Sequence, residues 1–162
     1  MNSSHDVRVR YQAAMKAYGD IRSAAPEKWH RPDVAEFTEL RQLLLPHAES
    51  GDLSCQCALA TILGFGLCCE TEEQFAAEQD EAKKEATRWW IAAAKQGFCP
   101  ALDNLVTCGT GPEAQRAKDA WHQLEQERPD LVAWYRNMPV YGPEFIEELS
   151  RRLYGQVIKD SY

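Results

Sequence analysis

Apolar side chains recur at steps of three and four residues along almost the whole of this 162-residue chain. The first such stripe predicts a helix over residues 6–24, with one face formed by Val7, Tyr11, Ala14, Tyr18 and Ile21. No stretch alternates strictly between apolar and polar residues, as a half-buried strand would. The sequence therefore predicts an all-α fold with essentially no sheet.

Prolines and glycines divide the rest of the chain into further helices. One predicted helix begins near Pro32 and ends or kinks at Pro46. Three further helices are predicted over 53–63, 71–96 and 131–136, and three more begin at Pro100, Pro112 and Pro143. On the 71–96 helix, Trp89 is expected on the core face with Ala86 and Ala93, and Trp90 points about 100° away. About eight short helices in succession favour a solenoid over a four-helix bundle.

Composition limits the function classes. A chain of this length fits one domain, here 1–162, and leaves no room for a separate cofactor domain. The net charge of -7 disfavours nucleic-acid binding, and no apolar run predicts membrane insertion. The N-terminal residues lack the apolar run of an export signal, so a cytoplasmic location is expected, or a periplasmic one if a signal was removed.

The six cysteines are expected to be reduced thiols, because disulfide frameworks belong to small chains with poor cores. Cys99 and Cys108 stand alone, as do all four histidines, so the sequence predicts neither a metal nor another cofactor. Adjacent Cys68 and Cys69 remain an alternative of another class, a thiol-redox pair. The nearby acidic residues oppose that alternative, because they raise the pKa of a thiol.

A local repeat lies in the middle of the chain. Ala48-Glu49-Ser50-Gly51 is matched 46 residues later by Ala94-Lys95-Gln96-Gly97, and each glycine precedes a predicted buried helix. Leu59 and Leu105 then hold equivalent places. Small alanines allow two helices to approach and glycine turns the chain, so the pattern predicts stacked helix pairs.

The segments 51–59, Gly64-Phe65-Gly66 and 85–97 resemble a Sel1-like repeat, a helix-pair unit related to the tetratricopeptide repeat. Its W-x-x-x-A-A-x-x-G pattern matches from Trp89 to Gly97. The resemblance implies N-terminal helices over 6–47, a repeat over 48–97, a degraded repeat over 98–127 that includes Trp121, and C-terminal helices over 128–162. Departures are Ala60 for a glycine, Leu63 for a tyrosine, and a longer, more acidic loop at 67–79.

The resemblance implies a non-enzymatic protein that binds another protein along the surface of its helices. Two roles stay open: an immunity protein that neutralises a toxin or effector, and an adaptor in a signalling or envelope complex. The sequence shows no catalytic motif. The candidate partner contacts are acidic residues that would steer a basic partner and aromatic residues that would anchor it: Glu70, Glu72, Glu73, Glu78, Asp80, Glu81, Trp29, Trp90, Trp134 and Tyr135.

Overall fold

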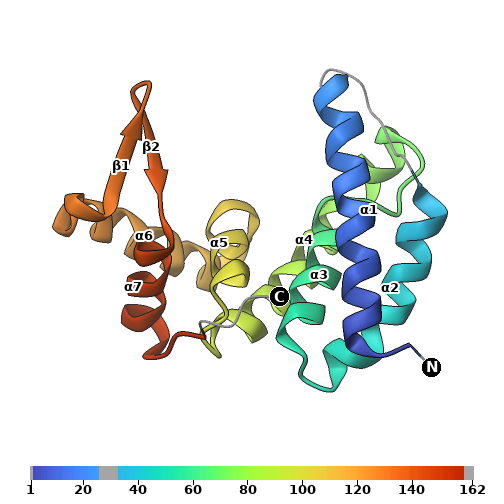
Figure 1. Ribbon diagram of the computed structural model, residues 1–162, viewed down its shortest axis with the longest axis horizontal. Helices are drawn as coiled ribbons and strands as arrows, with labels where there is room; N and C mark the ends of the chain where they lie inside the picture. The colour runs from blue at the N-terminus through green and yellow to red at the C-terminus, as the bar shows by residue number, and fades with distance from the viewer. Residues whose placement is uncertain (1, 26–32, 159–162) are drawn as a thin grey trace. The chain divides into compact units, whose positions relative to one another are not determined.

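The computed structural model describes residues 2–25 and 33–158 (Figure 1). Over these ranges most residues are helical, as predicted. The elements in chain order are α1 (Ser4–Ala24), α2 (Val34–Glu49), α3 (Leu53–Gly64), α4 (Glu72–Ala94), α5 (Cys99–Cys108), α6 (Gly111–Glu127), the 3-10 helix η1 (Pro129–Leu131), β1 (Val132–Tyr135), β2 (Met138–Tyr141) and α7 (Pro143–Tyr154). The contacts divide the chain into two compact units, one ending at Trp89 and the other beginning at Trp90.

The first unit packs α1 and α2 against α3. Phe37, Leu40 and Leu44 are fully buried on one face of α2, at the spacing that predicted this helix. Arg10 of α1 binds both Glu36, at 2.5 Å, and Glu39, at 2.7 Å, which fastens the two helices at their surface.

Helix α2 does not end at Pro46 but continues to Glu49. Proline lacks an N–H and removes one helical hydrogen bond, and in the last turn this loss is small. The carbonyl of Pro46 still accepts from the Ser50 N–H at 3.1 Å. Helix α3 follows, capped by the Asp52 side chain on Cys55 N–H, and every residue from Ser54 to Gly64 is buried.

The two predicted glycine turns have the same hydrogen bonds. Gly51 N–H donates to Ala48 C=O at 3.1 Å, and Gly97 N–H donates to Ala94 C=O at 2.9 Å. Each glycine has a positive φ, 97° for Gly51 and 89° for Gly97, which disfavours other residues. Leu59 and Leu105, on the helices that follow, are both buried. The repeat is therefore present in the local backbone as well as in the sequence.

The second unit packs α5, α6 and α7 around buried leucines and Phe145, and its C-terminal segment closes it. Ile158 N–H donates to Gly97 C=O at 3.0 Å, and Gln156 Nε2 donates to Lys95 C=O at 2.6 Å. At the other end of the same segment, the Ser150 hydroxyl donates to Gln156 C=O. The glycine turn before α5 is thus also the docking point of the chain's end.

The helix predicted over 131–136 is wrong, and so is the expected lack of sheet. Residues 132–141 form an antiparallel hairpin in which Trp134 lies opposite Pro139 and Tyr135 opposite Met138. Its two-residue turn, Arg136-Asn137, has positive φ at both positions, as a type I′ turn requires. Strand alternation was not visible in the sequence because apolar residues occupy both faces of this hairpin.

The expectation that Trp89 is the core tryptophan of α4 is also wrong. Trp90 is fully buried with Ala86, Ala93 and Ala94, whereas Trp89 is half-buried. The buried face of α4 keeps Ala86 and Ala93, as predicted, but extends toward Trp90 and Ala94 instead of Trp89. Trp90 Nε1 has no hydrogen-bond partner among the described residues, so this core position is occupied for its volume.

We expect Gly97→Ala to destabilise the protein more than Gly51→Ala. Both substitutions place a side chain in the left-handed region, at about 1 kcal/mol or more each. An added Cβ at Gly97 would lie 2.9 Å from the backbone of Gln156, whereas at Gly51 nothing lies within 4 Å. Urea unfolding should show an additional loss of at least about 1 kcal/mol for Gly97→Ala. Equal losses would show that the C-terminal segment is not docked on this turn.

We expect Trp90→Ala to lower the free energy of unfolding by about 3–5 kcal/mol because it empties a core site. Trp90→Phe should cost less than half as much, since it keeps most of the volume and removes an unpaired N–H. Trp89→Ala is the matched control and should cost about 1 kcal/mol. A larger loss for Trp89→Ala than for Trp90→Ala, measured in urea, would reverse the assignment of the core residue.

Candidate functional site

The acidic stretch, residues 70–85, covers the loop before α4 and the first half of that helix. It contains seven carboxylates against Lys83 and Lys84, a local charge of -5 (seven minus two). All six predicted acidic contacts are exposed: Glu70, Glu72, Glu73, Glu78, Asp80 and Glu81. Two of them, Glu72 and Glu73, lie in the first turn of α4, where the helix dipole favours negative charge.

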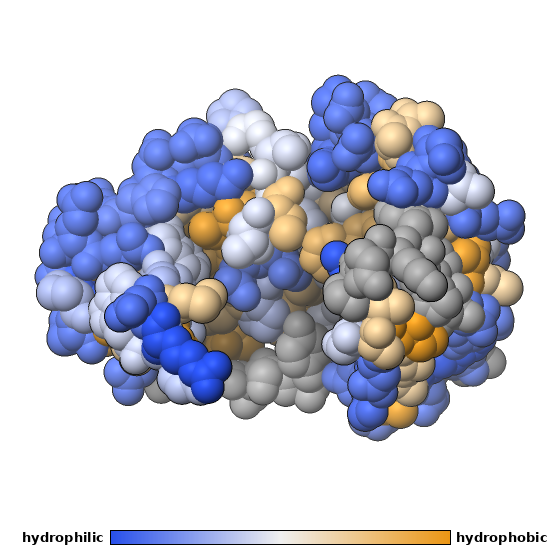
Figure 2. All heavy atoms as spheres, turned by 90° about the horizontal axis from the view of Figure 1, so that it is seen from above, coloured by the Kyte–Doolittle hydropathy of each residue, from blue (hydrophilic) through white to orange (hydrophobic). Residues whose placement is uncertain are grey.

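Few of these carboxylates are neutralised within the described part of the chain. Lys84 Nζ lies 2.9 Å from Glu81 Oε1 and holds the pKa of that carboxyl below its ordinary value. Glu78 accepts a hydrogen bond from Gln74 Nε2 at 3.4 Å. No ion pair of Glu72, Glu73 or Asp80 occurs in residues 2–25 and 33–158. The stretch therefore presents uncompensated negative charge to solvent. On the face of the molecule seen in Figure 2, hydrophilic residues cover much of the surface and hydrophobic residues show between them.

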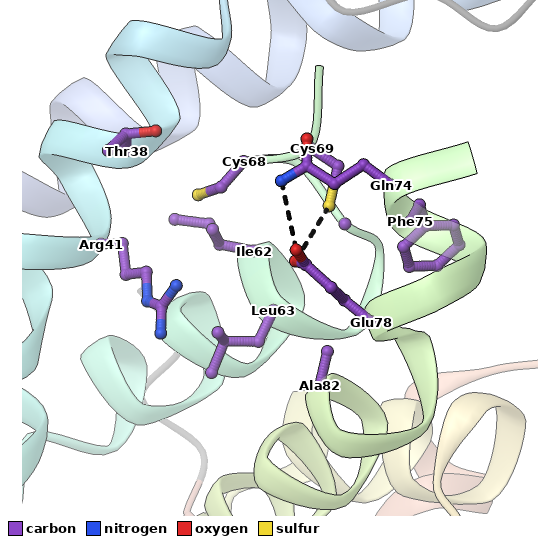
Figure 3. A pocket seen from close by; sticks show the side chains of 11 residues that line it. Thr38, Arg41, Ile62, Leu63, Cys68, Cys69, Gln74, Phe75, Glu78 and Ala82 are labelled. Atoms are coloured by element: carbon purple, nitrogen blue, oxygen red, sulfur yellow. Dashed lines mark hydrogen bonds between the residues drawn. The ribbon is translucent and has the colours of Figure 1, made fainter. Parts of the chain in front are cut away.

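A cavity of about 250 Å³ lies beside this stretch, within the first unit (Figure 3). Thr38 and Arg41 of α2 lie on one side of it, facing Cys68. Cys69, Gln74 and Glu78 gather on the side formed by α4. Ile62, Leu63, Phe75 and Ala82 supply apolar walls. The cavity joins a guanidinium, a carboxylate and two thiols that are distant in the sequence.

The two thiols of this cavity, Cys68 and Cys69, lie in a partly buried setting. Burial raises the pKa of Cys68, and the opposing effects of the Thr38 hydrogen bond and the Arg41 charge do not cancel it. Cys69 is buried, with its Sγ 4.0 Å from a Glu78 carboxylate oxygen. All six cysteines of the chain are free thiols. At Cys68, burial therefore outweighs the two interactions that favour the thiolate, which is the reactive form in a redox pair.

The apolar arm is the hairpin Val132–Tyr141, which stands away from α6 and α7 (Figure 1). Its predicted contacts Trp134 and Tyr135 are 69% and 62% exposed. Met138 and Val140, which sequence reasoning missed, are 67% and 46% exposed. The available signal was a pair of four-residue runs rich in aromatic and β-branched residues, VAWY and MPVY, flanking two residues with one asparagine.

The base of the arm is fixed by an aromatic cluster. Trp121 of α6, Tyr141 of β2 and Phe145 of α7 have ring centroids 4.5–4.9 Å apart. Glu125 accepts hydrogen bonds from Trp121 Nε1, at 2.8 Å, and from the Tyr141 hydroxyl. Burial raises the pKa of Glu125, but these hydrogen bonds outweigh it and hold the pKa below its ordinary value. The arm is therefore anchored at one end and free at its tip.

The predicted contacts are divided between the two units. The acidic stretch belongs to the first unit, whereas Trp134 and Tyr135 belong to the second. Trp90 is not retained as a candidate partner contact, because its side chain is fully buried and is not available to a partner. Trp29 lies outside the described residues. Arg41 and Thr38 were not predicted, because no sequence pattern links them to Cys68 across the fold.

We expect Glu125→Gln to destabilise the second unit by about 1 kcal/mol at pH 7, because hydrogen bonds to a charged acceptor are replaced by weaker ones. Since the folded pKa of Glu125 is lowered, the carboxylate stabilises the fold fully above the ordinary value of 4.5. This contribution is lost as the pH falls through the lower folded pKa. Denaturant unfolding should show the difference from wild type shrinking in acid, and a difference independent of pH would contradict the assignment.

Within residues 2–25 and 33–158, no group of three or more histidine, cysteine or acidic side chains is placed to hold a metal ion. None of the helices in the described ranges is long and apolar enough to span a bilayer. Comparison of the chain with protein-family models, with curated proteins and with solved structures gives no match.

Proposed function

We propose that this chain is a non-enzymatic protein of the Sel1-like repeat type that binds a basic protein partner, a toxin or effector that it neutralises. The observation that supports this most is the acidic stretch. The stretch has a local charge of -5 (seven carboxylates minus two lysines), and its carboxylates have few partners of their own. Such a surface attracts a basic protein over about one Debye length and speeds its association.

The repeated turn supports the helix-pair reading. Gly51 and Gly97 have the same conformation, the same hydrogen bonds and a buried leucine at the same distance along the next helix. Stacked helix pairs of this kind form extended surfaces that other proteins bind. A solenoid arrangement of the pairs is part of the proposal.

The first experiment is capture of the partner from native lysate, followed by assay of the partner's activity in the purified complex. Inhibition of that activity with one-to-one stoichiometry would support neutralisation. A partner that keeps full activity in the complex would instead support the adaptor role. Turnover of a substrate by the isolated chain would overturn both.

We expect charge reversal at Glu72, Glu73 and Asp80, each to Lys, to slow association with the captured partner about tenfold and to flatten the salt dependence of the rate. Stopped-flow association at several salt concentrations measures both. The dissociation rate should change much less, because long-range attraction acts mainly before contact.

The matched control reverses Asp20, Glu49 and Asp119, three exposed carboxylates outside the stretch, and changes the net charge equally. Thermal unfolding of both triple variants checks that the fold is kept; a small loss is expected at the N-terminus of α4. If both triple variants slow association equally, net charge and not the acidic stretch steers the partner. If neither does, the acidic stretch has no part in binding.

A further inference from the structure

The apolar side chains of the arm remain largely exposed, because the described part of the second unit does not cover them. Directly opposite residues of an antiparallel pair share a face, so Tyr135, Met138, Ala133 and Val140 lie together on one face of the hairpin. All four are exposed. An isolated two-stranded hairpin is marginally stable in water, and one that presents an apolar face is typical of an interaction site.

The two outer edges of the arm are not equivalent. In a hairpin closed by a two-residue type I′ turn, the closing pair is hydrogen-bonded and the next pair is not. Tyr135–Met138 is the closing pair here, so the backbone groups of Trp134 and Pro139 point outward, away from the partner strand. Pro139 has no N–H to offer, which blocks strand addition along β2. Trp134 offers both its N–H and its C=O along β1.

We propose that the outer edge of β1 is a self-association site, through which two copies of this chain pair antiparallel to form one four-stranded sheet. The order of strands would be β2, β1, then β1 and β2 of the second copy. Both ends of this sheet would be β2 edges blocked by Pro139, so the assembly closes at two copies. The arm has one competent edge, and a symmetric pair uses it completely.

The available backbone groups allow a register centred on Ala133. Val132 uses its N–H for the carbonyl of Pro129, so its C=O alone is free to accept from another strand. Pairing Trp134 N–H with Val132 C=O of the second copy satisfies these groups twice by symmetry. The same register places Ala133 opposite Ala133 at the two-fold axis, where the close approach of a non-hydrogen-bonded pair suits a small side chain.

Charge also favours a second copy at this place. The chain has a net charge of -7, so two copies repel each other over most of their surface. Residues 131–142 contain no acidic side chain and a single charged one, Arg136. Arg136 lies in the turn at the tip of the arm, and the nearest acidic side chain before β1 is Asp130, which Arg128 already binds. The arm therefore adds no like-charge repulsion of its own when a second copy approaches it.

The test begins with the mass of the full-length chain by sedimentation equilibrium from about 1 µM to about 1 mM. The expected result is a reversible dimer of twice 18.4 kDa that does not grow further. A mass of 18.4 kDa over the whole range would overturn the proposal. So would binding of the monomer to phosphatidylcholine vesicles in its place, which would make the arm a lipid contact.

Two substitutions at one position separate the edge from the side chain. Trp134→Val removes the aromatic ring and keeps the outward N–H, whereas Trp134→Pro removes both and leaves the β1–β2 hydrogen bonds intact. We expect the dimer dissociation constant of Trp134→Pro to be at least about tenfold higher than that of Trp134→Val, because two backbone donors per dimer are lost. Equal dissociation constants would overturn strand pairing.

Pro139→Val gives an independent result that does not depend on loss of folding. It adds an N–H to the outer edge of β2 and so opens the second edge. We expect this variant to form species larger than the dimer, and a dimer unchanged by Pro139→Val would contradict closure by the proline. Amide hydrogen exchange at Tyr135 and Met138 confirms in each variant that the hairpin is formed. Because this test uses the chain alone, its failure leaves the proposed partner binding untouched.

Discussion

The second unit depends on the packing of Trp121, Tyr141 and Phe145 around one carboxylate. These three rings come from α6, β2 and α7, and Glu125 accepts hydrogen bonds from two of them. This packing attaches the hairpin to α6 and α7 and so stabilises two strands that would be only marginally stable alone. The cluster also explains the burial of β2. Tyr141 is half-buried because it belongs to the cluster, whereas residues 138–140 lie beyond the cluster and are exposed.

Most helices could be predicted from local residue chemistry. Features that depend on packing between elements, such as the buried tryptophan and the cavity, could not. The start of α3 follows from the Asp52 cap, and the turns at Gly51 and Gly97 follow from a residue that accepts positive φ. The choice between Trp89 and Trp90 does not follow, because adjacent residues differ by one step of 100° and the packing partner decides which is buried. The exposure of the acidic residues was predictable from composition. The cavity was not, because Arg41 and Cys68 meet only in the folded unit.

The hairpin shows a limit of periodicity as a signal. Alternation between apolar and polar residues marks a strand only when one face is buried and the other is wet. In the apolar arm, both faces hold apolar residues, and Trp134, Tyr135 and Val140 read equally well as a helix or a strand. Apolar residues of a folded chain are usually buried, and here they are exposed. Exceptions of this kind are expected at sites that bind a ligand or a partner.

The acidic stretch and the apolar arm differ in chemistry as well as in the unit that carries them. The acidic stretch attracts basic surfaces and repels a second copy, whereas the apolar arm has no acidic group and one edge that can accept a strand. An exposed apolar hairpin with two open edges would template unlimited association. Pro139 removes that risk on one side, and pairing through β1 removes it on the other. Pro139, the residue that most weakens β2 as a strand, is therefore also the residue that limits strand addition along that edge of the exposed arm.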